Sequence, residues 1–178
     1  KRKDCRYPYK ELSGCGVGFK LCQGLNTIYK IPESELFELT DLLAISIASD
    51  IVAMTGENRV LAKQGLKFLR KTRKFGLRLL IPEEKLAHFE ISNIVFDIAP
   101  KINAAGRISH AKASVELMIS DNLKQAHQIV NEIVNLNDER REMDINITQS
   151  ALNQVLELEK VERYSTIVYD PSWNKGVI

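Results

Sequence analysis

The sequence predicts an α/β protein with a long helix near its C-terminal end. Two short runs of β-branched and aromatic residues, 94–96 and 166–169, have the composition of strands and stand among segments with helical spacing. The stretch 122–160 carries apolar residues at helical intervals, with no Pro or Gly to interrupt it. These observations divide the chain into 1–121, a long connecting helix over 122–162, and 163–178 as the first strand of a second domain.

Composition is that of an ordinary globular protein. The chain has 178 residues, of which 44% are hydrophobic and 27% charged, and its formal net charge is +2. So small a charge does not by itself indicate nucleic-acid binding. No apolar run reaches a membrane-spanning length. The three cysteines fit neither a CxxC pair nor a zinc pattern, which is typical of reduced thiols in a cytoplasmic protein.

Most of the chain before residue 121 predicts helices with recognisable starts. A glycine-rich turn precedes the first helix; it is not a dinucleotide loop, because the third glycine is misplaced and no strand precedes it. Pro and acidic residues open the next helix, as the helix dipole favours. We expect helices over 17–29 and from 32 onward into the apolar stretch 42–54. The next helix is expected over 55–72, with a buried face made of Val60, Leu61, Leu66 and Leu69. Two shorter helices are expected over 82–89 and around 115–119, the last with Ser109 as its cap.

Asp50 is notable because almost every other side chain in 42–54 is apolar or small. A carboxylate buried there is costly unless it is hydrogen-bonded, paired or bound to a metal. One interpretation makes Asp50 a cap or turn residue between two elements. The other makes it an oxygen ligand of Mg2+ or Mn2+, whose remaining ligands lie elsewhere.

The stretch Ile102-Asn-Ala-Ala-Gly-Arg107 places an amide and a guanidinium on either side of three small residues. Small residues let a bulky charged ligand approach closely, and Arg107 can then offer a planar fork of donors to a phosphate. The alternative is a tight turn before a helix, in which Arg107 is solvated or ion-paired.

Two other groups of basic residues also have two interpretations. The cluster between Lys67 and Arg78 is typical of one solvated helix face, with phosphate binding as the alternative. Arg140 and Arg141, near the centre of the long helix, are interpreted as solvated charges rather than as ligand contacts.

Six blocks follow one another along the chain, at 12–21, 41–52, 56–59, 99–108, 136–141 and 173–178. Taken together, they resemble the RecJ-type single-stranded-DNA exonucleases of the DHH phosphoesterase superfamily. The resemblance covers the whole chain, and the order and number of the blocks make it more specific than any one of them.

The resemblance implies the C-terminal part of a DHH-type α/β catalytic domain, a long bridging helix, and the start of a smaller, truncated α/β domain of the DHHA1 type. Asp50 falls on the family's fourth metal-site motif, an aspartate that holds the catalytic Mn2+ or Mg2+. Asn103 and Arg107 fall on a block whose arginine contacts substrate phosphate. The implied activity is metal-dependent hydrolysis of single-stranded DNA from its 5′ end, in DNA repair and recombination. The implied partners are single-stranded DNA and a single-strand-binding protein or helicase, in the cytoplasm and without a membrane.

Three departures from the family pattern bear on this expectation. The Asp-His-His block is absent, as is the glycine-rich block of the second domain, and Asn174 stands where the family has His. Because the sequence opens without Met and stops within a strand-like stretch, we expect it to be a piece of a longer protein that is inactive alone.

Two other functions are weighed against the exonuclease. A sister DHH phosphoesterase would cleave short oligonucleotides or cyclic dinucleotides, but such enzymes commonly lack the long helix that 123–160 predicts. A non-enzymatic helical scaffold would use that same helix to bind a partner. An Asp-His-His block upstream in the full-length gene would exclude the scaffold.

Overall fold

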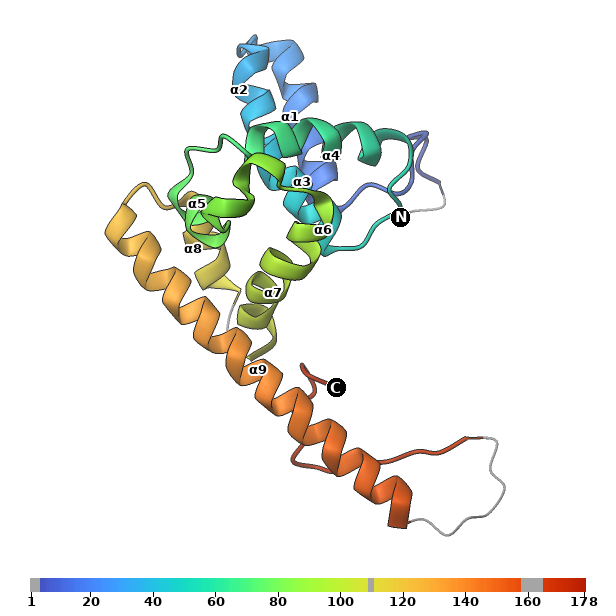
Figure 1. Cartoon of the computed structure of the whole chain (residues 1–178). Helices are drawn as coiled ribbons and strands as arrows, with labels where there is room; N and C mark the ends of the chain where they lie inside the picture. The colour runs from blue at the N-terminus through green and yellow to red at the C-terminus, as the bar shows by residue number, and fades with distance from the viewer. Residues whose placement is uncertain (1–3, 109–110, 158–164) are drawn as a thin grey trace.

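The computed structural model describes residues 4–108, 111–157 and 165–178, and its regular elements in these ranges are helical (Figure 1). In chain order they are α1 (Gly14–Tyr29), α2 (Glu33–Glu38), α3 (Thr40–Ser49), α4 (Gly56–Leu69), α5 (Phe75–Leu80), η1 (Glu83–His88, a 3-10 helix), α6 (Ile91–Asn93), η2 (Ile94–Ile98, a π-helical turn), α7 (Ala99–Ile108), α8 (Lys112–Ile119) and α9 (Leu123–Glu157). None of these helices is both long and apolar enough to cross a membrane.

The strand expected at 94–96 is wrong, because these residues form the π-helical turn η2. Ile94 and Ile98, four residues apart, are fully buried, whereas Phe96 between them is 78% exposed. This is the spacing of one helix face, and a short apolar run does not distinguish a buried helix from a strand. The α/β expectation therefore fails for this part of the chain.

Pro100 gives a physical reason for the wide turn. Proline has no N–H to donate, and its ring clashes with the carbonyl group four residues earlier in a regular helix. Immediately before it, the Ala99 N–H bonds the carbonyl oxygen of Ile94, five residues back.

The strand expected at 166–169 is not formed, because these residues have no regular secondary structure. Their backbone is bound by a side chain instead: the Gln154 amide donates to the Tyr169 carbonyl oxygen at 3.1 Å and accepts from the Tyr169 N–H at 3.2 Å. The boundary expected at 162 and the end of the connecting helix beyond Glu157 lie outside the described residues, as does Ser109 as a helix cap.

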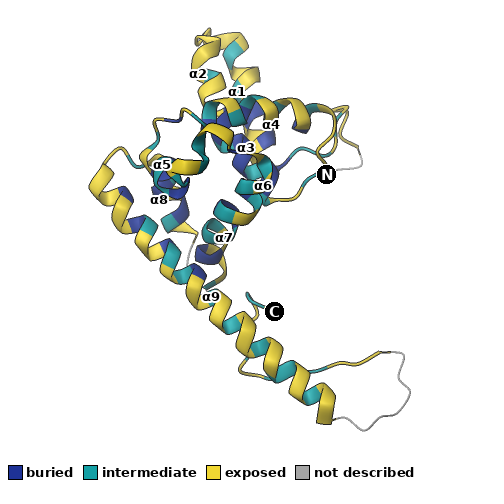
Figure 2. Ribbon diagram, viewed as in Figure 1, coloured by how far each residue is buried: buried dark blue, intermediate teal, exposed yellow. Residues whose placement is uncertain are grey.

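The core is built around α3, which lies beneath α4 and between α1 and α7 (Figures 1 and 2). Leu43, Ala44 and Ile47 on α3 are fully buried. Close packing with α4 depends on Gly65, where an added Cβ would lie 2.1 Å from the Thr40 carbonyl oxygen. The buried face of α4 includes Leu69, as expected, whereas Val60, also expected inside, is exposed.

The glycine-rich stretch lies inside α1 rather than forming a turn. Ser13 caps the helix, because its hydroxyl accepts the Gly16 N–H at 3.1 Å. Similarly, the helix expected to run from 32 into the apolar stretch 42–54 is divided at Leu39 into α2 and α3.

The long helix expected from the sequence is confirmed as α9, with 35 residues and a length of about 52 Å at 1.5 Å per residue. Its first half packs on α5, α7 and α8, and its second half extends away from them with mostly exposed residues (Figure 2). Ala126, Ile129, Ile133 and Asn137 form its buried face.

Candidate functional site

A groove of about 380 Å³ opens where the C-terminal end of α3, the helix α7, the middle of α9 and the C-terminal segment meet. Two arginines and an asparagine supply polar donors to it, and small or apolar side chains supply most of the rest. The lining residues are Ala48, Ser49, Ile51, Val95, Ala99, Pro100, Asn103, Arg107, Arg140, Asp144 and Val177.

Asn103 and Arg107 both lie on α7, one helical turn apart, and both line this groove. The tight turn considered from the sequence is therefore wrong for this stretch. Between the two polar residues, Ala104 and Ala105 are fully buried against the core. The small residues thus let α7 pack closely on one side while it presents an amide and a guanidinium on the other.

The C-terminal segment holds Arg107 in place. The Arg107 Nη1 donates to the Gly176 carbonyl oxygen at 2.9 Å, which occupies one of the five guanidinium donors. A Cβ at Gly176 would lie 2.5 Å from the Arg107 carbonyl oxygen, so this contact requires glycine. Asn174, where the resemblance led us to expect His, shapes the same turn by accepting the Gly176 N–H at 2.8 Å.

Asp50 is exposed and forms the C-cap of α3, so the buried position expected from the sequence is wrong. The apolar stretch buries its side chains on one helical face, but Asp50 follows the last helical residue. Its neighbours Ser49 and Ile51 both line the groove, which places the Asp50 backbone at the edge of that groove. The Asp50 backbone thus lies near the groove that Asn103 and Arg107 line, whereas its carboxylate contacts Ser46 and is not part of that lining.

The Asp50 carboxylate is oriented by two serines. The Ser46 hydroxyl lies 3.1 Å from Asp50 Oδ2 and 3.0 Å from Ser13 Oγ. Since a hydroxyl has only one proton, donation from Ser46 to the carboxylate leaves Ser46 to accept from Ser13. Ser13 also caps α1, so the N-terminus of α1 is connected to the Asp50 side chain.

Ile51, directly after Asp50, has a φ of 49°. This left-handed conformation is rare for a β-branched residue and costs free energy that the surrounding structure must offset. The Ile51 N–H bonds the Ala48 carbonyl oxygen at 3.3 Å as the chain leaves α3. The strained turn directs the backbone away from the helix immediately beside the groove.

The residues present supply only one ligand of a hard-metal site. Mg2+ and Mn2+ take about six oxygen ligands, and the described part of the chain contains no group of three or more His, Cys, Asp or Glu side chains that could hold a metal ion. Asp50 offers one carboxylate oxygen besides the one that Ser46 contacts. A complete site would need ligands from other residues.

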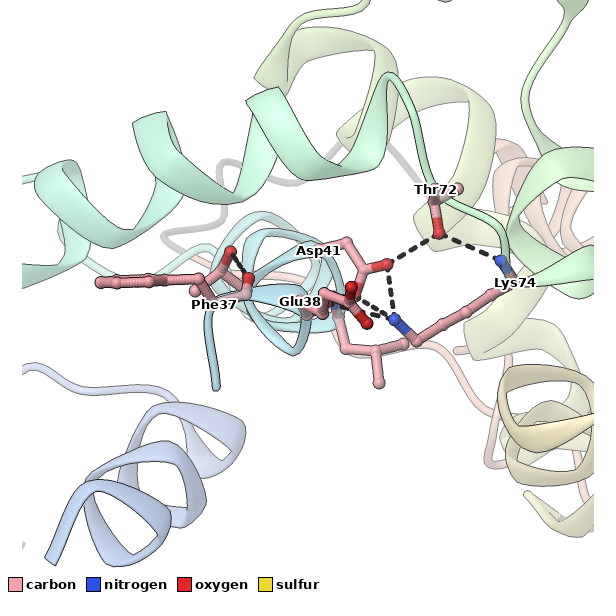
Figure 3. A network of polar contacts seen from close by, with 7 residues as sticks. Phe37, Glu38, Asp41, Thr72 and Lys74 are labelled. Carbon is pink, nitrogen blue, oxygen red and sulfur yellow. Dashed lines mark hydrogen bonds and ion pairs between the residues drawn. The ribbon is translucent and has the colours of Figure 1, made fainter. Parts of the chain in front are cut away.

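The basic cluster between Lys67 and Arg78 does not form one solvated face. Lys74 Nζ contacts both carboxylate oxygens of Asp41, at 2.7 and 2.9 Å, and the Thr72 hydroxyl donates to Asp41 at 2.8 Å (Figure 3). Arg70 donates to the Phe89 carbonyl oxygen through two nitrogens, at 2.9 and 3.1 Å. Arg70 and Lys74 therefore stabilise the fold, whereas Lys67, Lys71 and Arg73 are exposed.

The block 56–59 also stabilises the fold. Asn58 is fully buried and its amide donates to the carbonyl oxygens of Glu11 and Ala53, at 2.6 and 3.0 Å. Glu57 accepts from Tyr7 at 2.8 Å and pairs with Lys20 at 2.8 Å. The hydrogen bonds from Lys20 and Tyr7 lower the pKa of Glu57 below its ordinary value, against the opposing effect of burial.

Sequence reasoning missed Arg140, which was interpreted as a solvated charge but lines the groove. A signal was present in its spacing. Arg140 lies seven residues after Ile133 and three after Asn137, both of which are buried, and therefore on the packed face of α9. Arg141, one residue later, is exposed.

Comparison with known proteins gives consistent matches. The chain is 37% identical over 183 residues to the single-stranded-DNA-specific exonuclease RecJ of Bacillus subtilis, covering 100% of this chain and 22% of that protein. The fold is similar to that of RecJ from Thermus thermophilus in complex with Mn2+, with a TM-score of 0.79, 29% identity, and coverage of 98% of this chain and 26% of that one. A second solved structure, exonuclease RecJ bound to manganese, has a TM-score of 0.82 at 30% identity, with coverage of 97% and 43%.

No family profile matches this chain. The chain spans about a fifth to a third of the length of the curated relatives that it matches, from 22% to 33%. The matches in sequence and in fold cover nearly the whole of this chain, including the blocks that carry Asp50, Asn103 and Arg107. The chain accordingly belongs to the RecJ family.

Proposed function

We propose that this chain is part of a metal-dependent exonuclease that hydrolyses phosphodiester bonds of single-stranded DNA from the 5′ end. The observation that carries the proposal is the 37% identity to the RecJ exonuclease of Bacillus subtilis over the whole of this chain. Roles in DNA repair and recombination, a cytoplasmic location, and a single-strand-binding protein or helicase as partner belong to the same proposal. So does the assignment of 1–121 to the C-terminal part of a DHH-type catalytic domain and of 163–178 to the start of a second, DHHA1-type domain.

In this proposal the groove binds the DNA backbone. Asn103 and Arg107 donate hydrogen bonds to phosphate oxygens, and the charge of the guanidinium makes its contact the stronger of the two. Their position on one rigid helix fixes the phosphate relative to the end of α3. The position of both donors in the lining of one groove supports this assignment.

Asp50 is the proposed ligand for Mn2+ or Mg2+. A bound metal supplies a Lewis acid that polarises the phosphodiester and lowers the pKa of a bound water. The contribution of this chain is to hold the Asp50 carboxylate in one orientation through a hydrogen bond from Ser46. The other ligands are proposed to come from parts of a RecJ protein outside this chain.

The test is a nuclease assay on the full-length protein with a 5′-labelled single-stranded oligonucleotide and Mn2+. Asp50→Ala should abolish turnover while DNA binding persists, because the change removes a metal ligand and a negative charge. Arg107→Ala should lower substrate use by about tenfold to a hundredfold, equivalent to a charge-assisted hydrogen bond of about 1.5–3 kcal/mol. Near-normal turnover of Asp50→Ala would show that Asp50 is only a helix cap.

A further inference from the structure

Arg140 is held in the groove without a complete set of partners. Its side chain is 25% exposed, and its Nε is buried with no hydrogen-bond partner among the described residues. The Arg140 Nη1 lies 3.9 Å from Asp144 Oδ2, a long contact to a half-exposed carboxylate one turn along α9. Such an i,i+4 pair at a surface contributes little and does not compensate for a buried guanidinium N–H without an acceptor.

The position of Arg140 is set by packing rather than by solvent. It lies on the face of α9 that carries Ile133 and Asn137, and this face packs against α7. The neighbouring Arg141 lies off this face and is exposed. Of these two adjacent arginines, the helix therefore presents one to the groove and the other to solvent.

Arg107 enters the same groove from α7, so two guanidinium groups from different helices line one cavity. The lining carries these two guanidinium groups and one carboxylate, that of Asp144, so a net positive charge remains that favours an anion. A phosphodiester backbone is the anion of matching chemistry, because each phosphate accepts the planar fork of one guanidinium.

We propose that Arg140 is a second phosphate-binding arginine, which together with Arg107 clamps the backbone of single-stranded DNA between α7 and α9. The exposed part of the Arg140 side chain supplies the contact, and Asp144 moderates the charge of the groove when no DNA is bound. This inference rests on the proposed function, since it takes single-stranded DNA as the ligand.

The test measures the affinity of the full-length protein for a fluorescent oligothymidylate by anisotropy, across a salt series and in EDTA so that no cleavage occurs. Each phosphate contact contributes about −0.7 to the slope of log K against log salt for single strands. Arg140→Gln should weaken binding by about tenfold and reduce the steepness of that slope by about 0.7. Arg107→Gln should do the same, and the double variant should lose about 1.4.

Two matched variants separate this role from a structural one. Arg141→Gln removes an equal charge one residue away and should leave both the affinity and the slope unchanged. Asp144→Asn removes the ion-pair partner of Arg140 and should tighten DNA binding. If the pair were purely structural, Arg140→Gln and Asp144→Asn would lose the same thermal stability and both would bind DNA like the wild type. An unchanged slope in Arg140→Gln, with the variant folded, overturns the proposal.

Failure of the Arg140 proposal can be distinguished from failure of the proposed exonuclease function. If the wild-type protein binds the oligonucleotide with the expected dependence on Arg140 but has no Mn2+-dependent nuclease activity, the clamp stands and the exonuclease proposal fails. If the nuclease is active and Arg140→Gln binds DNA like the wild type, the exonuclease stands and the clamp fails.

Discussion

Asp41 and Asp50 lie at the beginning and end of the same helix but have opposite environments. Asp41 is 2% exposed and its carboxylate is satisfied by Lys74, Thr72 and a backbone N–H (Figure 3). Asp50 is exposed, and its carboxylate accepts a hydrogen bond from Ser46. The buried residue therefore stabilises the fold, whereas the exposed one remains available to a ligand, which is the reverse of the usual expectation that a buried carboxylate marks a site.

The hydrogen bond to Asp50 makes Ser46 a positioning residue at the scale of one side chain. We expect Ser46→Ala to lower the apparent Mn2+ affinity of the full-length enzyme by about tenfold or more, as is typical when the hydrogen-bond partner of a metal ligand is removed. The measurement is activity against Mn2+ concentration. Ser49→Ala is the control, because the Ser49 hydroxyl lies on the same helix and is buried without a partner among the described residues. Equal Mn2+ dependence of Ser46→Ala and the wild type would exclude this role.

At the scale of elements, the contact between α3 and α4 is the one on which the site depends. It aligns α3 so that its C-terminal end reaches the groove, and it is close because Gly65 has no side chain. We expect Gly65→Ala to destabilise the protein by about 3 kcal/mol, because the new methyl group would overlap the backbone of α3 and force the helices apart. Urea unfolding at equilibrium measures the difference.

Gly24 in α1 provides a matched control for this prediction. An added Cβ there meets no described atom within 4 Å, so Gly24→Ala should stabilise the helix by up to about 1 kcal/mol through its higher helix propensity. Opposite signs for the two substitutions would identify packing as the cause. A similar small stabilisation from both would mean that α3 and α4 do not approach so closely in solution.

At the scale of the whole molecule, the N-terminal segment is attached to α4 through Glu57, which gives stability a pH dependence. Because the folded pKa of Glu57 is lowered, this contribution is present above the ordinary glutamate pKa of about 4.5 and is lost as the pH falls through the folded value. We expect thermal stability to decrease below that pH in the wild type and to decrease less in Glu57→Gln. Glu84→Gln, at an exposed glutamate in η1, should retain the wild-type profile.

The outer face of α1 gives the molecule an apolar surface with no partner in the described residues. Val17, Leu21, Leu25 and Ile28 recur at helical spacing and are all exposed. An exposed stripe of this kind favours association, so we expect the 178-residue chain to elute above its monomer mass in size-exclusion chromatography with light scattering. Leu21→Lys should shift it toward the monomer, whereas Ile145→Lys, at an exposed position on α9 away from this stripe, should not. A chain that is monomeric at every concentration contradicts this expectation.

The sequence alone determined the long helix α9, the helical character of most of the chain, and the blocks that carry Asp50, Asn103 and Arg107. These depend on local periodicity and residue type, which act over a few turns. Tertiary structure decided the conformation and the burial of individual residues within those features. The run 94–96 became a helical turn because Ile94 and Ile98 share a buried face and Pro100 follows, and Asp50 became exposed because α3 ends before it. Arg140 entered the groove because the packed face of α9 continues past Ile133, and only contacts between distant segments reveal which side of a charged helix is covered.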